Sequence, residues 1–148
     1  MAIIGILLNI AVAGYNRLID DAQNQKTADN LKASLAQARS EAITHGGNVR
    51  VCGSNDGNTC TNSFNAGWLS YYDIDIDATL TNADTILAWH EVDYNGTRIN
   101  ATNSDDVEIT HFGFNYRGYP VLPIELEVFG RTEDSTLQIH ANGRVEIQ

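Results

Sequence analysis

Basic residues are scarce in this chain, and so are proline, cysteine and long apolar runs. Nine lysines and arginines stand against 19 aspartates and glutamates, so the 148 residues carry a formal net charge of −10. Such acidity favours solubility and disfavours non-specific binding to DNA or to anionic lipid headgroups. Most of the acidic residues follow residue 70. We therefore expect them on the solvated surface of a domain in the later part of the chain.

Catalytic motifs are also missing from the sequence. It contains no Gly-x-Ser-x-Gly elbow, no His-Glu-x-x-His and no phosphate-cradling glycine loop. The four histidines are scattered singly, at positions where ordinary strand or surface histidines are expected: His45, His90, His111 and His140. We expect neither an enzyme nor a cofactor.

No proline interrupts the first 46 residues. From residue 16 on, apolar side chains recur at spacings of three, four and six, which places them on one stripe of a helix: Leu18, Ala22, Ala28, Leu31, Leu35, Ala38 and Ala42. The run stops at Gly46-Gly47, where glycine ends helices readily. The pattern predicts one helix over residues 1–46, with Leu31, Leu35, Ala38 and Ala42 packed against the following domain.

The first 15 residues of that helix are apolar all round, with Asn9 as the strongly polar exception. A bilayer core takes about 20 apolar residues to cross, so this stretch alone is short for a span. A secretory signal is disfavoured because no basic leader and no Ala-x-Ala site frame it. We expect a helix partly in the membrane and partly packed against other subunits, through Ile3, Ile4, Ile6, Leu7, Leu8, Ile10 and Val12.

Cysteine occurs only at positions 52 and 60, on either side of a turn-forming Gly-Ser-Asn-Asp-Gly-Asn-Thr run. We predict a disulfide between Cys52 and Cys60, which implies an oxidising compartment. The alternative, a two-thiolate metal site, lacks nearby ligands to complete a tetrahedral set.

Residues 47–148 alternate between apolar and polar side chains in short segments, which predicts one antiparallel β-rich domain. The expected strands are 48–52, 68–76, 85–92, 107–112, 124–129 and 137–140, the last continuing through an Asn142-Gly143 turn into 144–147. Turns are expected at 94–96 and 117–120, and surface loops at 62–66 and 100–106. The predicted fold class is α+β: a long N-terminal helix (1–46) whose C-terminal half packs against one sheet of a β-sandwich-like domain.

Asp73, Asp75 and Asp77 are the candidates for a metal site, since their spacing suits a strand face or a Ca²⁺ loop. A calcium loop of the EF-hand type starting at Asp73 would need glycine at its sixth position and glutamate at its twelfth, where Ala78 and Asp84 stand. We instead expect a strand with Ile74 and Ile76 inward and the three carboxylates in water, and no bound metal.

Five stretches of the sequence carry a resemblance to one family. Met1 to Val12 resembles the second half of the N-terminal segment of type IV pilins and type II secretion pseudopilins. The run Leu35 to Ala42, the Cys-bounded loop Val51 to Cys60 and Gly67-Trp68-Leu69 are similar to the GspH/FimT group of minor pilins. The resemblance extends to Asn142-Gly143-Arg144-Val145 at the end of the chain.

Two family features are absent: a basic leader cut before phenylalanine, and a glutamate shortly after it. We expect the natural chain to begin about nine residues earlier, which would lengthen the apolar segment to a bilayer span. Leader processing and the role of the glutamate therefore cannot be assigned to a residue here.

The resemblance implies a structural subunit that is anchored in the inner membrane and then assembled with other pilins through its N-terminal helix. Its head would be periplasmic or on an extracellular filament. The alternative is a binding module at a pilus tip, either an adhesin or a DNA-uptake receptor. Some FimT-type pilins bind DNA through Gly-Arg-x-Arg, but here Glu146 replaces the second arginine. DNA contact would have to come from Arg117, Arg131 and Arg144, on an acidic domain that disfavours it.

Overall fold

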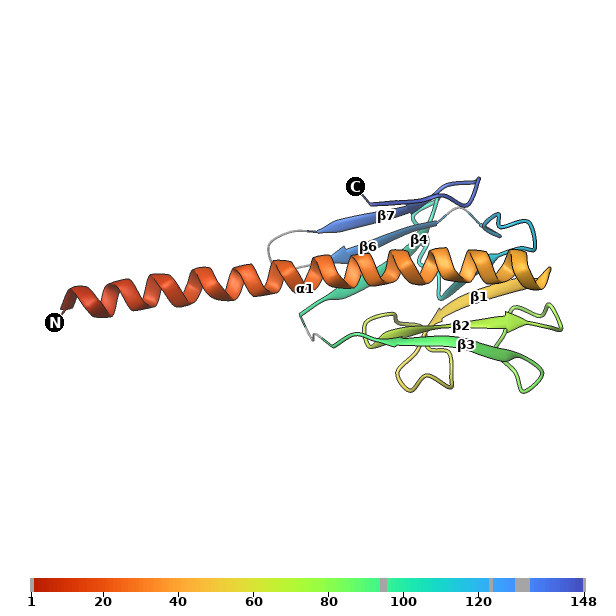
Figure 1. Cartoon of the computed structure of the whole chain (residues 1–148), viewed down its shortest axis with the longest axis horizontal. Coiled ribbons are helices and arrows are strands. Elements are labelled where there is room, and N and C mark those ends of the chain that lie inside the picture. The colour runs from red at the N-terminus through yellow and green to blue at the C-terminus, as the bar shows by residue number, and fades with distance from the viewer. Residues whose placement is uncertain (1, 94–95, 123, 130–133, 148) are drawn as a thin grey trace.

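The computed structural model describes the backbone of residues 2–93, 96–122, 124–129 and 134–147, with side chains from residue 18 onward. One helix is followed by eight strands within these ranges. Figure 1 shows the helix lying along the strand-rich head and extending well beyond it toward the N-terminus.

Helix α1 spans Ala2–His45, as the sequence predicted. It ends where Gly46 takes a left-handed conformation (φ 67°) and the Gly47 N–H donates a 3.2 Å hydrogen bond to the Ala42 carbonyl. This is a Schellman cap, in which glycine avoids the steric penalty of positive φ. The helix therefore stops through its own sequence and turns the chain back into the first strand.

The strands form two antiparallel sheets of four. The first has the order β3–β2–β1–β5 and is built from β1 (Asn48–Gly53), β2 (Gly67–Asp73), β3 (Thr85–Glu91) and β5 (His111–Phe114). The second has the order β4–β6–β7–β8 and is built from β4 (Arg98–Asn103), β6 (Ile124–Phe129), β7 (Ser135–Ile139) and β8 (Val145–Ile147). The α+β class with a long N-terminal helix is confirmed.

The C-terminal half of α1 packs against both sheets, contacting β1 and β5 of the first and β6, β7 and β8 of the second. The prediction that it packs against one sheet was wrong. In Figure 1 it runs between the second sheet above and the first sheet below. Its buried side chains join inward-facing residues of both sheets in one core, among them Leu31, Leu35, Ala38, Ala42, Val51, Phe114 and Leu126.

Two other strand assignments need correction. Residues 100–106 were expected to be a loop, but β4 occupies Arg98–Asn103 and pairs along its whole length with β6. Residues 107–112 were expected to be a strand, but β5 begins at His111, and Glu108 makes an isolated bridge to Thr102. Half of the residues of β4 are Asn or Thr, so its own sequence does not indicate a strand. It is held in the sheet by its pairing with β6, whose alternating apolar residues are buried.

The last two strands form the predicted hairpin, with a longer loop than expected. The His140 N–H donates to the Arg144 carbonyl at 2.9 Å, and the Gly143 N–H donates to the His140 carbonyl at 2.7 Å. Residues 141–143 therefore form a three-residue loop with Gly143 left-handed (φ 77°), instead of the two-residue turn that Asn-Gly suggested. The turn at 117–120 is present, and the predicted turn at 94–96 includes residues outside those described.

Candidate functional site: the helix, its exit from the head and the loops around it

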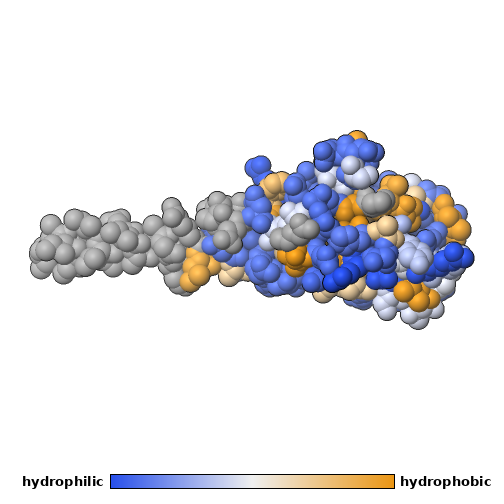
Figure 2. Space-filling model, turned by 90° about the horizontal axis from the view of Figure 1, so that it is seen from above, coloured by the Kyte–Doolittle hydropathy of each residue, from blue (hydrophilic) through white to orange (hydrophobic). Residues whose placement is uncertain are grey.

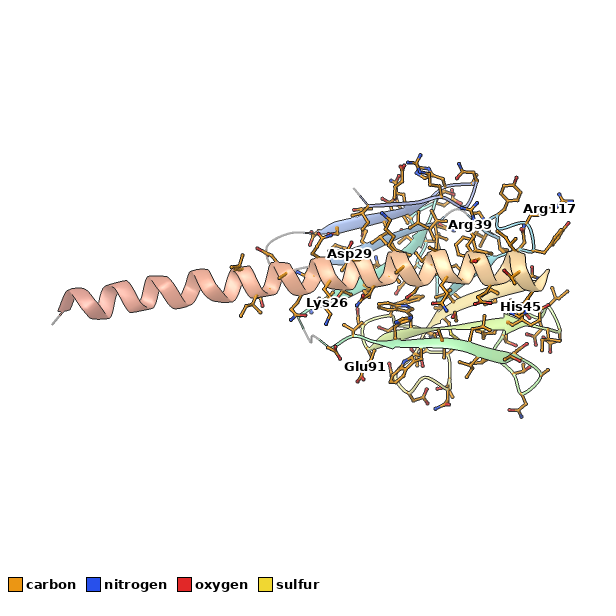
Figure 3. All side chains as sticks on the ribbon, viewed as in Figure 1. Lys26, Asp29, Arg39, His45, Glu91 and Arg117 are labelled. Carbon is orange, nitrogen blue, oxygen red and sulfur yellow. A yellow bond between two sulfur atoms is a disulfide. The ribbon has the colours of Figure 1, made fainter. Side chains whose placement is uncertain are left out.

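The four residues predicted to join helix and head are all buried: Leu31, Leu35, Ala38 and Ala42. Two polar contacts, both missed from the sequence, fix the helix at either end of this face. Near its exit, the Thr97 hydroxyl donates a buried 2.6 Å hydrogen bond to Asn24 Oδ1. At the opposite end, Arg39 reaches the C-terminal hairpin, and Figure 3 shows it among the loops there.

The guanidinium of Arg39 donates through Nη1 to the Gly143 carbonyl and through Nη2 to the Asn142 carbonyl, both at 2.9 Å. A Cβ at Gly143 would lie 2.1 Å from the Gly118 carbonyl oxygen, so glycine is required for this close approach. Helix, hairpin and the 117–120 turn therefore meet at one point. Arg39 lies in the Leu35 to Ala42 run, which carries the family resemblance as Asn142-Gly143 does, but no local pattern predicted that they touch.

The helix leaves the head with apolar side chains uncovered. Leu18 is 68% exposed and Ile19 is 39% exposed. The residues predicted to contact membrane or sister subunits (Ile3, Ile4, Ile6, Leu7, Leu8, Ile10 and Val12) belong to the same continuous helix, and their side chains lie outside those described. Within the described residues, no helix combines the length and apolarity needed to span a membrane. Figure 2 shows that one face of the head is largely hydrophilic, with separate hydrophobic patches.

The structure contains the disulfide between Cys52 and Cys60, with an Sγ–Sγ distance of 2.02 Å. Cys52 is buried with Leu69 and Tyr71 on the face of the first sheet opposite the main core. Inside the closed loop, the Asp56 carboxylate accepts from the N–H groups of Asn58 and Thr59 at 2.8 Å each, which lowers its pKa to about 2. The bridge and the carboxylate together hold the loop over the sheet.

Replacing Cys52 with alanine and Cys60 with serine is expected to lower the free energy of unfolding by about 2–3 kcal/mol, because the bridge restricts the unfolded chain. Chemical denaturation of the variant and the parent measures the difference. Thiol titration of the non-reduced parent is expected to find no free thiol. Two titratable thiols would contradict the bridge.

The strand predicted over residues 68–76 is confirmed as far as Asp73 and is wrong beyond it. Strand β2 ends at Asp73, and Ile76 and Ala78 take left-handed conformations (φ 62° and 65°) that no strand contains. Ile74 and Ile76 do not point inward: they are 51% and 68% exposed, whereas Asp73 is buried.

The three candidate metal-ligating aspartates are not the three that the fold gathers. Asp77 is used locally, accepting hydrogen bonds from the N–H and hydroxyl of Thr79 at 2.7 Å. Instead, Asp84 joins Asp73 and Asp75, each with a carboxylate oxygen within 4.8 Å of the others. Asp84 stands at the twelfth position of a calcium loop counted from Asp73. The alternation of a strand relates only near neighbours in sequence, so it did not predict that Asp84 lies beside Asp73.

The arginines proposed for DNA contact are engaged with other side chains where the structure describes them. Arg144 Nη2 lies 2.7 Å from Glu146 Oε1, and the Arg117 guanidinium lies 5.1 Å from the centre of the Tyr116 ring. Arg131 falls outside the described residues. A carboxylate beside Arg144 competes with a phosphate for the same guanidinium, so these residues form a poor phosphate site.

The histidines occupy separate surroundings. The Nε2 atom of His45 lies 3.1 Å from Glu41 Oε2, and that of His140 lies 3.1 Å from Glu146 Oε2. The ring of His90 stacks on Trp68, and His111 lies beside Thr110. None belongs to the carboxylate cluster found among the described residues.

Comparison with solved structures identifies the architecture. The type IV minor pilin FimU of Pseudomonas aeruginosa matches with a TM-score of 0.66 and 18% identity, over 87% of this chain and 90% of FimU. The minor pseudopilin EpsH of the Vibrio cholerae type II secretion system matches with a TM-score of 0.62 and 12% identity, over 87% of this chain and 94% of EpsH. The fold is that of the pilin class, a long N-terminal helix on a two-sheet head.

The family model for the type II transport protein GspH matches residues 27–143. The chain belongs to this family of minor pilins and pseudopilins, whose members serve a structural role in a pilus or pseudopilus at the cell envelope. No protein of curated function matches the sequence significantly. The family match begins at Thr27, so the resemblance of Met1 to Val12 to pilin N-termini stays a prediction.

Proposed function

We propose that this chain is a minor pilin or pseudopilin subunit that is held in the inner membrane by residues 1–15 and is then assembled into a filament. In this proposal the head, residues 47–148, faces the periplasm before assembly and the filament surface afterwards. The neighbouring pilin subunits are its partners, and it catalyses no reaction. The GspH family match supports the assembly role.

The observation that carries the proposal is the uncovered start of the helix. The head packs over α1 from about Asn24 onward, while Leu18 and Ile19 expose apolar surface next to an apolar N-terminal segment. Apolar surface that the head does not cover is exposed to water, and burying it against another apolar surface is favourable. Lipid tails serve this purpose before assembly, and the helices of sister subunits serve it afterwards.

A structural role is preferred over a DNA-uptake receptor because the net charge is −10 and Arg144 is paired with Glu146. A gel shift at low salt that is lost in Arg144→Ala would favour the receptor. An adhesin role would be favoured by a point substitution on the exposed face of the head that abolishes adhesion and leaves piliation normal.

Leu7→Asp is expected to remove the chain from the membrane and from the filament while leaving the head folded. A carboxylate in hydrocarbon costs about 3 kcal/mol at the centre of a helix, which corresponds to about a hundredfold loss in membrane partitioning. Membrane fractionation measures the first effect, and recovery of the variant in sheared or purified filaments measures the second.

Gln37→Asp is the matched control, because it adds the same charge to the same helix at an exposed position beside the head. It is expected to fractionate and assemble like the parent. Normal filament incorporation of Leu7→Asp would overturn the proposal.

A further inference from the structure

Three carboxylates converge where β2 ends and the 74–84 loop begins. Asp73 is the last residue of β2, Asp75 lies two positions further on, and Asp84 stands just before β3. One oxygen from each lies within 4.8 Å of the other two. Two oxygen ligands on opposite sides of one calcium ion, each about 2.4 Å from it, are separated by about this distance.

The charge of this cluster is not balanced by the described side chains that contact it. Arg50 is the cation present, with its Nε 3.0 Å from Asp73 Oδ2. Three carboxylates and one guanidinium leave a net charge of −2. A divalent cation would bring the cluster to neutrality.

One carboxylate oxygen of Asp73 is buried and left without a partner. The residue is only 2% exposed, and its Oδ1 atom is buried without a hydrogen-bond partner, although Oδ2 binds Arg50. Leaving a buried charged oxygen unpaired is costly, and buried carboxylates are normally paired or bound to metal. The orphaned oxygen belongs to a residue of the cluster, so Asp73 keeps an oxygen with lone pairs free to bind a cation.

The loop holds its carboxylates in place before any ion arrives. Asp84 accepts from the Ile74 N–H at 2.9 Å through Oδ1 and from the Thr81 N–H at 2.8 Å through Oδ2. The Tyr71 hydroxyl donates to the Ala78 carbonyl at 3.2 Å and ties the middle of the loop to β2. Each carboxylate oxygen has two lone pairs, so these contacts leave Asp84 able to ligate.

We propose that Asp73, Asp75 and Asp84 bind a calcium ion that fastens the 74–84 loop to the end of β2. Three carboxylates suit calcium, which takes six to eight oxygens in flexible geometry, better than magnesium, which keeps most of its waters. Asp75 is exposed, so water completes the coordination on the solvent side. This site is independent of the proposed filament role, because it uses no residue of α1.

The test titrates CaCl₂ into the full chain, stripped with EDTA and held in a non-ionic detergent, using calorimetry and thermal unfolding. We expect a dissociation constant of about 0.1–1 mM, typical of extracellular calcium modules, and a rise in melting temperature that saturates with it. Tb³⁺ is expected to give luminescence sensitised by the nearby Tyr71, and Ca²⁺ to quench it by competition. MgCl₂ is expected to bind at least about tenfold more weakly.

Asp75→Asn is the diagnostic variant, because Asp75 is exposed and its replacement leaves the sheet intact. It is expected to weaken Ca²⁺ binding by at least about tenfold. Asp77→Asn is the matched control. It removes the same charge two residues after Asp75, from a carboxylate that accepts hydrogen bonds from Thr79 instead of joining the cluster. It is expected to weaken Ca²⁺ binding less than about threefold. No heat and no thermal shift with about 10 mM Ca²⁺, roughly ten times the weakest expected dissociation constant, would overturn the proposal. Equal losses in the two variants would also overturn it.

Discussion

Replacing Leu35 with alanine is expected to lower the free energy of unfolding of the head by about 3 kcal/mol, within the range of about 2–5 kcal/mol for buried leucines. Leu35 is fully buried on the face of α1 that contacts both sheets, so its removal leaves a cavity that neither sheet can fill alone. Urea unfolding of the full chain in detergent, followed by tryptophan fluorescence, measures the change. Trp68 dominates the signal because it is buried in the same core, whereas Trp89 is partly exposed.

The same leucine-to-alanine change at position 18 is the matched control. Leu18 lies on the same helix but is mostly exposed, so Leu18→Ala is expected to change the free energy of unfolding by less than about 0.5 kcal/mol. A loss below about 1 kcal/mol for Leu35→Ala would show that the head folds without using the helix as part of its core. Equal losses at the two positions would contradict the burial pattern.

Features that depend on neighbours in sequence could be predicted from the chain. The helix and its end follow from the spacing of apolar residues and from Gly46-Gly47, which supply the stripe and the cap by themselves. The disulfide follows from two cysteines around a turn-forming run. The β7–β8 hairpin follows from Asn142-Gly143, although the bulge that makes its loop three residues long was not evident.

Features that depend on residues far apart in sequence were missed or assigned wrongly. The alternation Asp-Ile-Asp-Ile-Asp fits a strand, but Asp73 is held by Arg50 in β1, and the chain turns away from the sheet beyond it. The alternation rule assumes that apolar side chains face the core, and here Ile74 and Ile76 face water. Asp84 enters the acidic cluster because the loop returns to start β3, which no short-range pattern records.

The contact between Arg39 and the C-terminal hairpin shows the same limit. The Ala38 to Ala42 run and Asn142-Gly143 both carry the family resemblance, more than 100 positions apart. Their joint presence is explained by one contact: an arginine on the helix satisfies two carbonyls of a turn that only glycine allows. This contact fixes the last strands on the helix, so it positions the edge of the second sheet.

Replacing Arg50 with methionine is expected to lower the free energy of unfolding by about 3–5 kcal/mol, because it leaves Asp73 buried without its cation. Arg50 and Asp73 are both buried, and the arginine side chain lies against Gly113, where a Cβ would be 3.0 Å from its Cδ. Methionine keeps most of the buried volume, so the loss reports on charge rather than on packing. The measurement is urea unfolding in EDTA, so that a bound cation does not replace the missing arginine.

The double variant Arg50→Met, Asp73→Leu is expected to recover most of that stability, since replacing both partners of a buried ion pair by apolar residues is often neutral. Asp73→Leu alone is expected to cost less than Arg50→Met, because the long arginine side chain can turn its charged end toward water while the short carboxylate cannot. The double-mutant cycle therefore gives a coupling energy of at least about 2 kcal/mol. Additive losses, with a coupling below about 0.5 kcal/mol, would mean that the pair does not hold β1 and the end of β2 together.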